Sequence, residues 1–105
     1  MPAVARVGDL ISTGHGCDAS APIAGPGAST VFVNAFPAAI NGSPIGPHTI
    51  TNPASPPTPP CIPHPGQVVN TASKTVYANA VGIARNLDSA DLGAITQGSP
   101  NVFAN

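Results

Sequence analysis

The sequence has few of the residues that build a large hydrophobic core and few charged residues. It contains no Trp, one Tyr and three Phe, it lacks Glu, and only 7% of its 105 residues are charged. Three Lys and Arg residues are too few for the basic surface of a nucleic-acid-binding protein. The net charge of −1 and the positive mean hydropathy also exclude the highly charged composition of disordered chains.

Long hydrophobic runs are absent too. No apolar stretch approaches the roughly 20 residues that a membrane-spanning helix needs. The first 13 residues have no continuous apolar segment of the kind found in a signal peptide. We therefore expect a single domain over residues 1–105 that is made in the cytoplasm, where reducing conditions disfavour a disulfide between Cys17 and Cys61.

The chain is instead rich in turn residues and in short repeated motifs. Eleven Gly and 14 Pro punctuate three segments that share Ser, Val, an aromatic residue and a final Asn: 27–34, 72–79 and 98–105. A second motif follows or precedes them: 2–9, 37–41 and 81–88. The β-branched and aromatic residues favour short strands, and Asn favours tight turns. This pattern predicts an all-β, loop-rich fold, with a helical turn within 84–95 as the one local alternative.

All histidines and cysteines lie outside these strand motifs: His15, Cys17, His48, Cys61 and His64. Zinc prefers four ligands from thiolate sulfur and imidazole nitrogen, and the two-residue gap between Cys61 and His64 lets both reach one ion. A site closed by four ligands would stabilise the fold and leave no position for a catalytic water. Spacing alone does not decide which of the five is left out.

The proline-rich segment 56–65 contains two of these candidates. Such a composition is typical of a spacer between structured parts. The presence of Cys61 and His64 within it favours a different role, in which the segment clamps a metal ion.

Four features of the sequence occur together: the repeated strand motif, "PAVARVGD", "TGHGC", and the His, Cys and His of the long loop. With these features the chain resembles the PAAR-repeat family over nearly its whole length. This resemblance implies a small cone of short β-hairpins with pseudo-threefold symmetry and one structural zinc ion near the apex. It implies the ligands His15, His48, Cys61 and His64, with Cys17 left over and the proline-rich loop passing over the apex. The family turns through Asn-Gly, whereas this chain has Asn34-Ala35 and Asn79-Ala80.

The resemblance also implies a function. The protein would be the non-enzymatic tip that caps a trimeric β-helical spike of a contractile injection system and helps it to puncture a target membrane. A type VI secretion system is the expected setting, and a phage tail or an extracellular contractile particle is the alternative. The tip would stay in the producing cell until assembly and then be delivered with the apparatus. It would have no effector extension, although it could carry separate effector cargo.

Two other functions compete with this interpretation. A zinc-stapled adaptor unrelated to injection would share the metal site but would not bind a trimeric spike. A small zinc hydrolase would use three ligands and a water. The hydrolase is disfavoured because Glu is absent and because all four Asp residues are remote in sequence from Cys61 and His64: Asp9, Asp18, Asp88 and Asp91.

Overall fold

In the structure, a computed structural model, the strands of the described residues pair as short antiparallel hairpins. The structure describes residues 1–54, 56–57 and 60–105. Its strands are β1 (Leu10–Ser12), β2 (Ser20–Pro22), β3 (Phe32–Val33), β4 (Phe36–Pro37), β5 (Thr49–Thr51), β6 (Cys61–Pro63), β7 (Tyr77–Ala78), β8 (Val81–Gly82), β9 (Ser89–Ala90) and β10 (Gly93–Ala94). Within the described ranges there is no helix, and hence none that could cross a membrane. The all-β prediction is confirmed, and a β9–β10 hairpin occupies the segment where a helical turn was the alternative.

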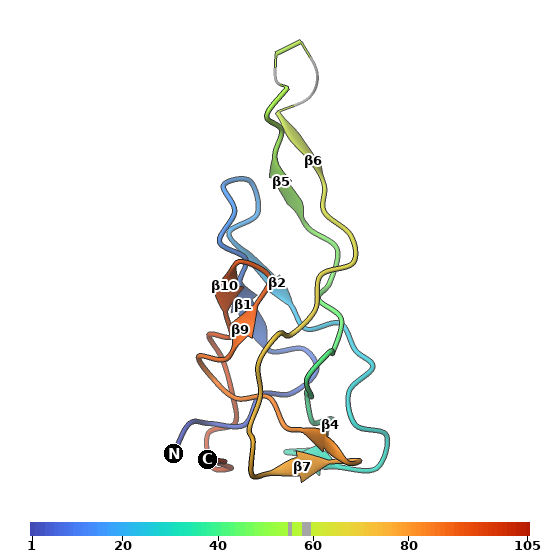
Figure 1. The fold of residues 1–105 in the computed structure, drawn as a ribbon, viewed down its shortest axis with the longest axis vertical. Coiled ribbons are helices and arrows are strands. Elements are labelled where there is room, and N and C mark those ends of the chain that lie inside the picture. The colour runs from blue at the N-terminus through green and yellow to red at the C-terminus, as the bar shows by residue number, and fades with distance from the viewer. Residues whose placement is uncertain (55, 58–59) are drawn as a thin grey trace.

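The molecule tapers from a broad base to a narrow end (Figure 1). Its extents are 47 × 23 × 22 Å. The base carries β4, β7 and both chain ends, and the β5–β6 hairpin lies at the opposite end. The described part of the proline-rich segment therefore extends the narrow end and does not fold back across the molecule.

One turn is used three times in the lower half. Its copies are Arg6–Asp9, Ile40–Ser43 and Arg85–Asp88, and in each the fourth residue donates its backbone N–H to the carbonyl oxygen of the first. The first residue in turn donates its N–H to the side chain of the fourth, over 2.8 Å, 3.0 Å and 2.8 Å respectively.

The hydrogen bonds of the third copy also affect the ionisation of Asp88. Burial acts to raise the pKa of Asp88, but hydrogen bonds from Arg85 and Thr71 outweigh it and lower the pKa.

A closed ring of backbone hydrogen bonds surrounds the axis that relates these turns. Ala5 donates to Ala84 over 2.9 Å, Ala84 donates to Ala39 over 2.8 Å, and Ala39 donates back to Ala5 over 3.0 Å. All three residues are completely buried. Only a small side chain fits where three backbones approach one axis this closely. The predicted pseudo-threefold symmetry is thus present in the backbone itself.

Three hairpins lie above this ring: β1–β2, β5–β6 and β9–β10. We call them the upper hairpins, and they pair with one another around the same axis. The pairs that join neighbouring hairpins are Ile23 with Ile45, Val69 with Ala90, and Ile95 with Ile11. These six residues are buried and form most of the upper hydrophobic core. Because the pairs close a circle, the β1–β2 loop, the β9–β10 turn and the foot of the β5–β6 hairpin converge above the core.

The base is formed by the repeated strand motif. Two copies make the hairpins β3–β4 and β7–β8. The third copy pairs with the start of the chain, where Phe103 lies opposite Ala3 and Ala104 donates its N–H to the carbonyl oxygen of Pro2. The third hairpin is therefore assembled from the two ends of the chain, which lie side by side in Figure 1.

Both complete base hairpins turn through left-handed Asn and Ala. The φ angles are 53° and 70° at Asn34 and Ala35, and 52° and 66° at Asn79 and Ala80. Positive φ at both central residues defines the type I′ turn that suits the twist of paired strands. The hairpins keep this turn although Ala takes the place that glycine occupies most easily.

Candidate metal centre

Three histidines and one aspartate converge where the upper hairpins meet. His15 lies in the loop between β1 and β2, His48 precedes β5, His64 follows β6, and Asp91 lies in the turn between β9 and β10. One ligand atom from each of the four lies within 4.8 Å of the others. Each of the three upper hairpins therefore supplies at least one member of the cluster.

The Asp91 carboxylate is the centre of the cluster. Its Oδ1 lies 3.0 Å from Nε2 of His15, and its Oδ2 lies 2.8 Å from Nε2 of His48 and 3.5 Å from Nδ1 of His64. The side chains of Asp91 and His48 are 1% and 2% exposed, so this contact is almost free of solvent. Burial acts to raise the pKa of Asp91, but hydrogen bonds with His15 and His48 outweigh it and lower the pKa.

The orientation of His48 prepares it to bind a cation. Its Nδ1 lies 2.9 Å from the carbonyl oxygen of Gly46, which can only accept a hydrogen bond, so Nδ1 carries a proton. In the neutral imidazole, Nε2 then holds a lone pair that faces the Asp91 carboxylate and Nδ1 of His64, 3.2 Å away. A lone pair and a carboxylate repel each other unless a proton or a cation lies between them. A carbonyl group that fixes the ring in this way is typical of metal-binding histidines.

The cluster is compact enough to hold one metal ion. Zinc binds imidazole nitrogen and carboxylate oxygen at about 2.0–2.1 Å in a tetrahedron, so neighbouring ligand atoms lie about 3.3 Å apart. The separations of 2.8–3.5 Å between Asp91 and the three histidines involve both carboxylate oxygens, and with one ligand atom from each residue the four atoms lie within 4.8 Å of one another. Three nitrogens and one oxygen thus form a four-ligand set that could hold a metal ion without a cysteine.

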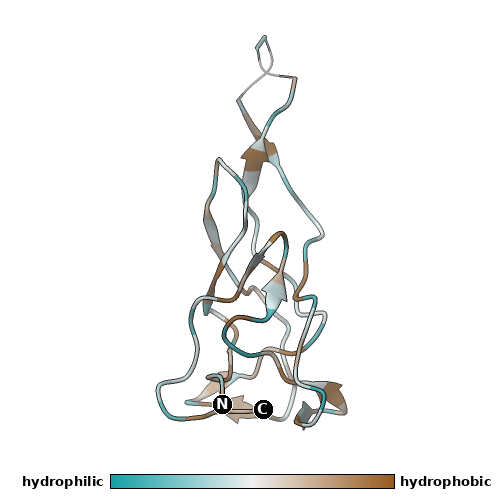
Figure 2. Ribbon diagram, turned by 60° about the vertical axis from the view of Figure 1, so that its left-hand side comes forward, coloured by the Kyte–Doolittle hydropathy of each residue, from teal (hydrophilic) through white to brown (hydrophobic). Residues whose placement is uncertain are grey.

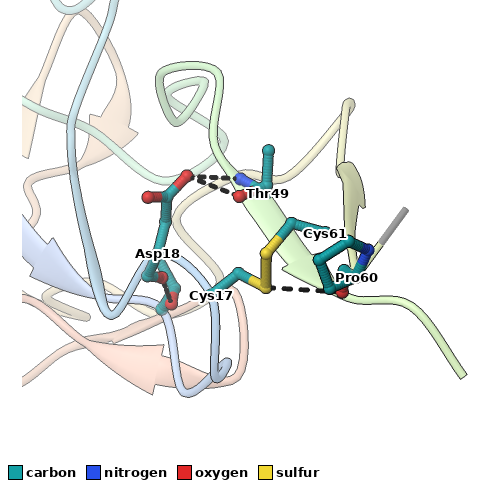
Figure 3. The surroundings of a disulfide bond; sticks show 6 residues. Cys17, Asp18, Thr49, Pro60 and Cys61 are labelled. Carbon is teal, nitrogen blue, oxygen red and sulfur yellow. Dashed lines mark hydrogen bonds between the residues drawn. A yellow bond between two sulfur atoms is a disulfide. The ribbon is translucent and has the colours of Figure 1, made fainter. Parts of the chain in front are cut away.

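The structure corrects the sequence prediction at both cysteines. Cys61 was predicted to be the fourth ligand and Cys17 to be left over, but their sulfurs are bonded to each other, with the two Cα atoms 6.0 Å apart (Figure 3). A disulfide sulfur has no thiolate charge to give a metal, so Cys61 is not available as a ligand while the bond is formed. The Cys-x-x-His spacing instead places one residue in a cross-link and the other, His64, in the cluster.

Asp91 was not identified as a ligand from the sequence, because the symmetry of the fold and not its sequence distance from the histidines brings it into the cluster. It is 27 positions beyond His64 in the sequence, yet its side chain lies within 3.5 Å of that histidine. Two of the three upper hairpins carry histidines, and the third carries none. Once the threefold relation is recognised, the acidic tip of the third hairpin is the position from which a fourth ligand can come.

The loop that carries His15 is held in place by polar contacts. The Asp18 carboxylate accepts hydrogen bonds from the backbone N–H of Thr49 over 2.7 Å and from its Oγ1 over 2.9 Å. These hydrogen bonds lower the pKa of Asp18. Thr13 Oγ1 donates to the carbonyl oxygen of Asp18 and accepts the N–H of His15 over 3.1 Å. The contacts fix the loop against the strand that follows His48.

A second candidate site lies at the base, where aromatic side chains face solvent. Phe32, Tyr77 and Phe103 occupy equivalent positions of the three strand motifs and are 58%, 60% and 50% exposed. The next residue in each motif is buried in the lower core: Val33, Ala78 and Ala104. Strand alternation therefore turns one aromatic residue outward from each third of the base, where Figure 2 shows hydrophobic ribbon beside the chain ends.

The sequence matches no family model, and no curated protein matches it.

Proposed function

We propose that this protein is the structural tip that caps a trimeric β-helical spike of a contractile injection system, with a type VI secretion system as the setting. The observation that carries the proposal is the base, where three pseudo-equivalent aromatic residues are exposed around one axis: Phe32, Tyr77 and Phe103. A single chain can match a threefold-symmetric partner only if its own contact surface approximates threefold symmetry.

The chemistry of the base supports such a partner. Aromatic side chains contribute most to protein interfaces, and exposed apolar residues gathered on one face indicate a contact surface. The opposite end narrows to one hairpin, as a piercing tip requires (Figure 1). The resulting role is mechanical and not catalytic, with the target membrane met only transiently and with effector cargo as an optional further partner.

We also propose that the cluster of His15, His48, His64 and Asp91 holds one structural zinc ion. The nitrogen and carboxylate donors suit zinc. The ion would join three hairpins that are already paired through backbone hydrogen bonds, and it would add a bond at the point where their ligands converge. It would thereby stiffen the narrow half of the tip, where load enters during penetration.

Binding to a trimeric spike tests the proposal. The protein is co-expressed with a trimeric β-helical spike protein from the same genome, and the mass of the complex is measured by native mass spectrometry. One tip per spike trimer is expected. The triple variant Phe32→Ser, Tyr77→Ser, Phe103→Ser should lose the complex while keeping its fold. Leu92→Ser is the matched control, because Leu92 is 74% exposed but lies at the upper β9–β10 hairpin. Retention of the complex by the triple variant would refute the assignment of the base.

Elemental mass spectrometry of the purified protein tests the metal. One zinc ion per chain is expected, with loss in Asp91→Ala and retention in Cys61→Ser at saturating zinc. The reverse pattern would restore the cysteine as a ligand and would contradict the cluster seen in the structure.

A further inference from the structure

The disulfide joins the two segments that supply the histidines of the metal centre. Cys17 lies two residues after His15 in the β1–β2 loop, and Cys61 lies three residues before His64 in β6. The bond spans a sequence separation of 44 residues. It is therefore the covalent connection between the loop of His15 and the hairpin of His48 and His64.

The disulfide and the Asp18 contacts attach the loop to both strands of this hairpin. Asp18 binds Thr49 at the start of β5, and Cys17 is bonded to Cys61 at the start of β6 (Figure 3). Thr51 and Cys61 are directly paired across the two strands. Of these attachments only the disulfide is covalent, and the hydrogen bonds can exchange with water.

The disulfide is accessible to a small reductant. Cys61 is exposed, and Cys17 is partly exposed. A low-molecular-weight thiol can attack one sulfur to give a mixed disulfide and one free cysteine. A second thiol then attacks the mixed disulfide and releases the other cysteine. Two thiols become one small-molecule disulfide, and their two electrons and two protons reduce the protein to Cys17 and Cys61 thiols.

We propose that the Cys17–Cys61 disulfide controls the affinity of the metal centre, which binds zinc more tightly when the disulfide is formed than when it is reduced. The inference rests on the proposed zinc site. With the bond intact, His15 is already held beside the other ligands. After reduction, zinc binding must also order the His15 loop, and the entropy lost in doing so weakens binding. We expect a difference of about tenfold, within the usual range of coupling between two sites.

The direction of the coupling matches the proposed path of the protein. A reducing cytoplasm keeps the cysteines as thiols in the producing cell. An oxidising compartment reached during delivery would form the bond and tighten the metal centre. Thermodynamic linkage also requires the reverse effect, so bound zinc should make the disulfide harder to reduce by the same factor.

Zinc affinity measured in defined redox states tests this proposal. The metal-free protein is titrated in competition with a chromophoric zinc chelator in three forms: disulfide-bonded, reduced and freed of reductant under anaerobic conditions, and as the double variant Cys17→Ala, Cys61→Ala. Hydrogen exchange of the metal-free forms reports whether residues 13–19 become mobile. Leu87→Ser with its disulfide intact is the control that should bind like the unmodified protein, because Leu87 is 76% exposed and lies outside the cluster and the His15 loop.

The proposal predicts about tenfold weaker binding in the reduced protein and in the double variant, with exchange at residues 13–19 accelerated by a larger factor than exchange in the rest of the chain. Equal affinity in all three forms would overturn the coupling while leaving the zinc site intact. Tighter binding by the reduced protein alone would overturn it by showing that the thiols act as ligands. A uniform acceleration of exchange across the chain, with no larger effect at residues 13–19, would identify the disulfide as a general stabiliser and not a control of this centre. Absence of zinc binding in every form would remove the zinc site itself.

Discussion

Leu87 occupies a backbone conformation that suits glycine, and its replacement should stabilise the protein. It is the third residue of the repeated turn 85–88, with φ of 74°, where the other two copies have Gly8 at 99° and Gly42 at 89°. Its side chain is 76% exposed, so the leucine gains little from burial. The substitution Leu87→Gly therefore removes backbone strain at almost no cost in packing.

The expected gain follows from two opposing contributions. A left-handed conformation costs an L-amino acid about 1–2 kcal/mol. Glycine removes this cost but lowers the free energy of unfolding by about 0.5–1 kcal/mol, because it has more conformational freedom in the unfolded chain. The net stabilisation should be about 0.5–1 kcal/mol, which corresponds to a rise in Tm of roughly 2–8 °C for a domain of this size.

Thermal and urea unfolding of the disulfide-bonded, metal-free protein measure the effect. Leu92→Gly is the matched control, since Leu92 is 74% exposed and is not among the residues with positive φ. It should lower stability by about 0.5–1 kcal/mol through the unfolded state alone. Gly42→Ala should be destabilising as well, although a Cβ at Gly42 would meet no atom within 4 Å. If Leu87→Gly and Leu92→Gly shift Tm in the same direction, the argument from φ is wrong.

Three further outcomes follow from other features. Ala35→Gly and Ala80→Gly should each raise the free energy of unfolding by roughly 0.5–1 kcal/mol, because glycine suits the second left-handed position of a type I′ turn; a fall in Tm would contradict this. Removal of the disulfide in the double variant Cys17→Ala, Cys61→Ala should cost about 4 kcal/mol in denaturant unfolding, from the entropy of closing a loop with a separation of 44. The lowered pKa of Asp88 means that its carboxylate stabilises the fold above its ordinary pKa and that this contribution is lost as pH falls through the folded-state pKa. The stability difference between the unmodified protein and Asp88→Asn should therefore be constant from pH 5 to 7 and shrink below about pH 4, and a difference that grows on acidification would refute the assignment.

The repeats allowed much of the fold to be predicted from the sequence. Three strand motifs with alternating apolar residues and terminal Asn became two base hairpins and a third pairing between the chain ends. The three histidines were also identified, because their residue type and their place outside the strands mark them individually. These features depend on residues that are close together in the sequence, so they can be predicted from the sequence alone.

The cross-link and the fourth ligand could not be predicted in this way. The disulfide was rejected on the grounds of compartment, whereas geometry brings Cys17 and Cys61 together at the two ends of a 44-residue separation. Asp91 was discounted because it is distant in sequence, yet the circular pairing of the upper hairpins brings its tip to the histidines. Both errors concern contacts between different hairpins, which depend on the arrangement of the whole chain.

The third base hairpin has a consequence for how the chain could be reconnected. In β3–β4, the two turn residues Asn34 and Ala35 separate the paired residues Val33 and Phe36. In the third copy, the hydrogen bond between Ala104 and Pro2 leaves residues 105 and 1 at those two turn positions. A direct peptide bond from residue 105 to residue 1 would thus complete a hairpin of the same length with no added linker. The domain thus has three equivalent base turns, two of which are closed by the chain and one of which is open between its two ends. A permuted chain that opens between Asn79 and Ala80 should therefore reach the same structure. In that chain the slow pairing of the two chain ends during folding would form the β7–β8 hairpin.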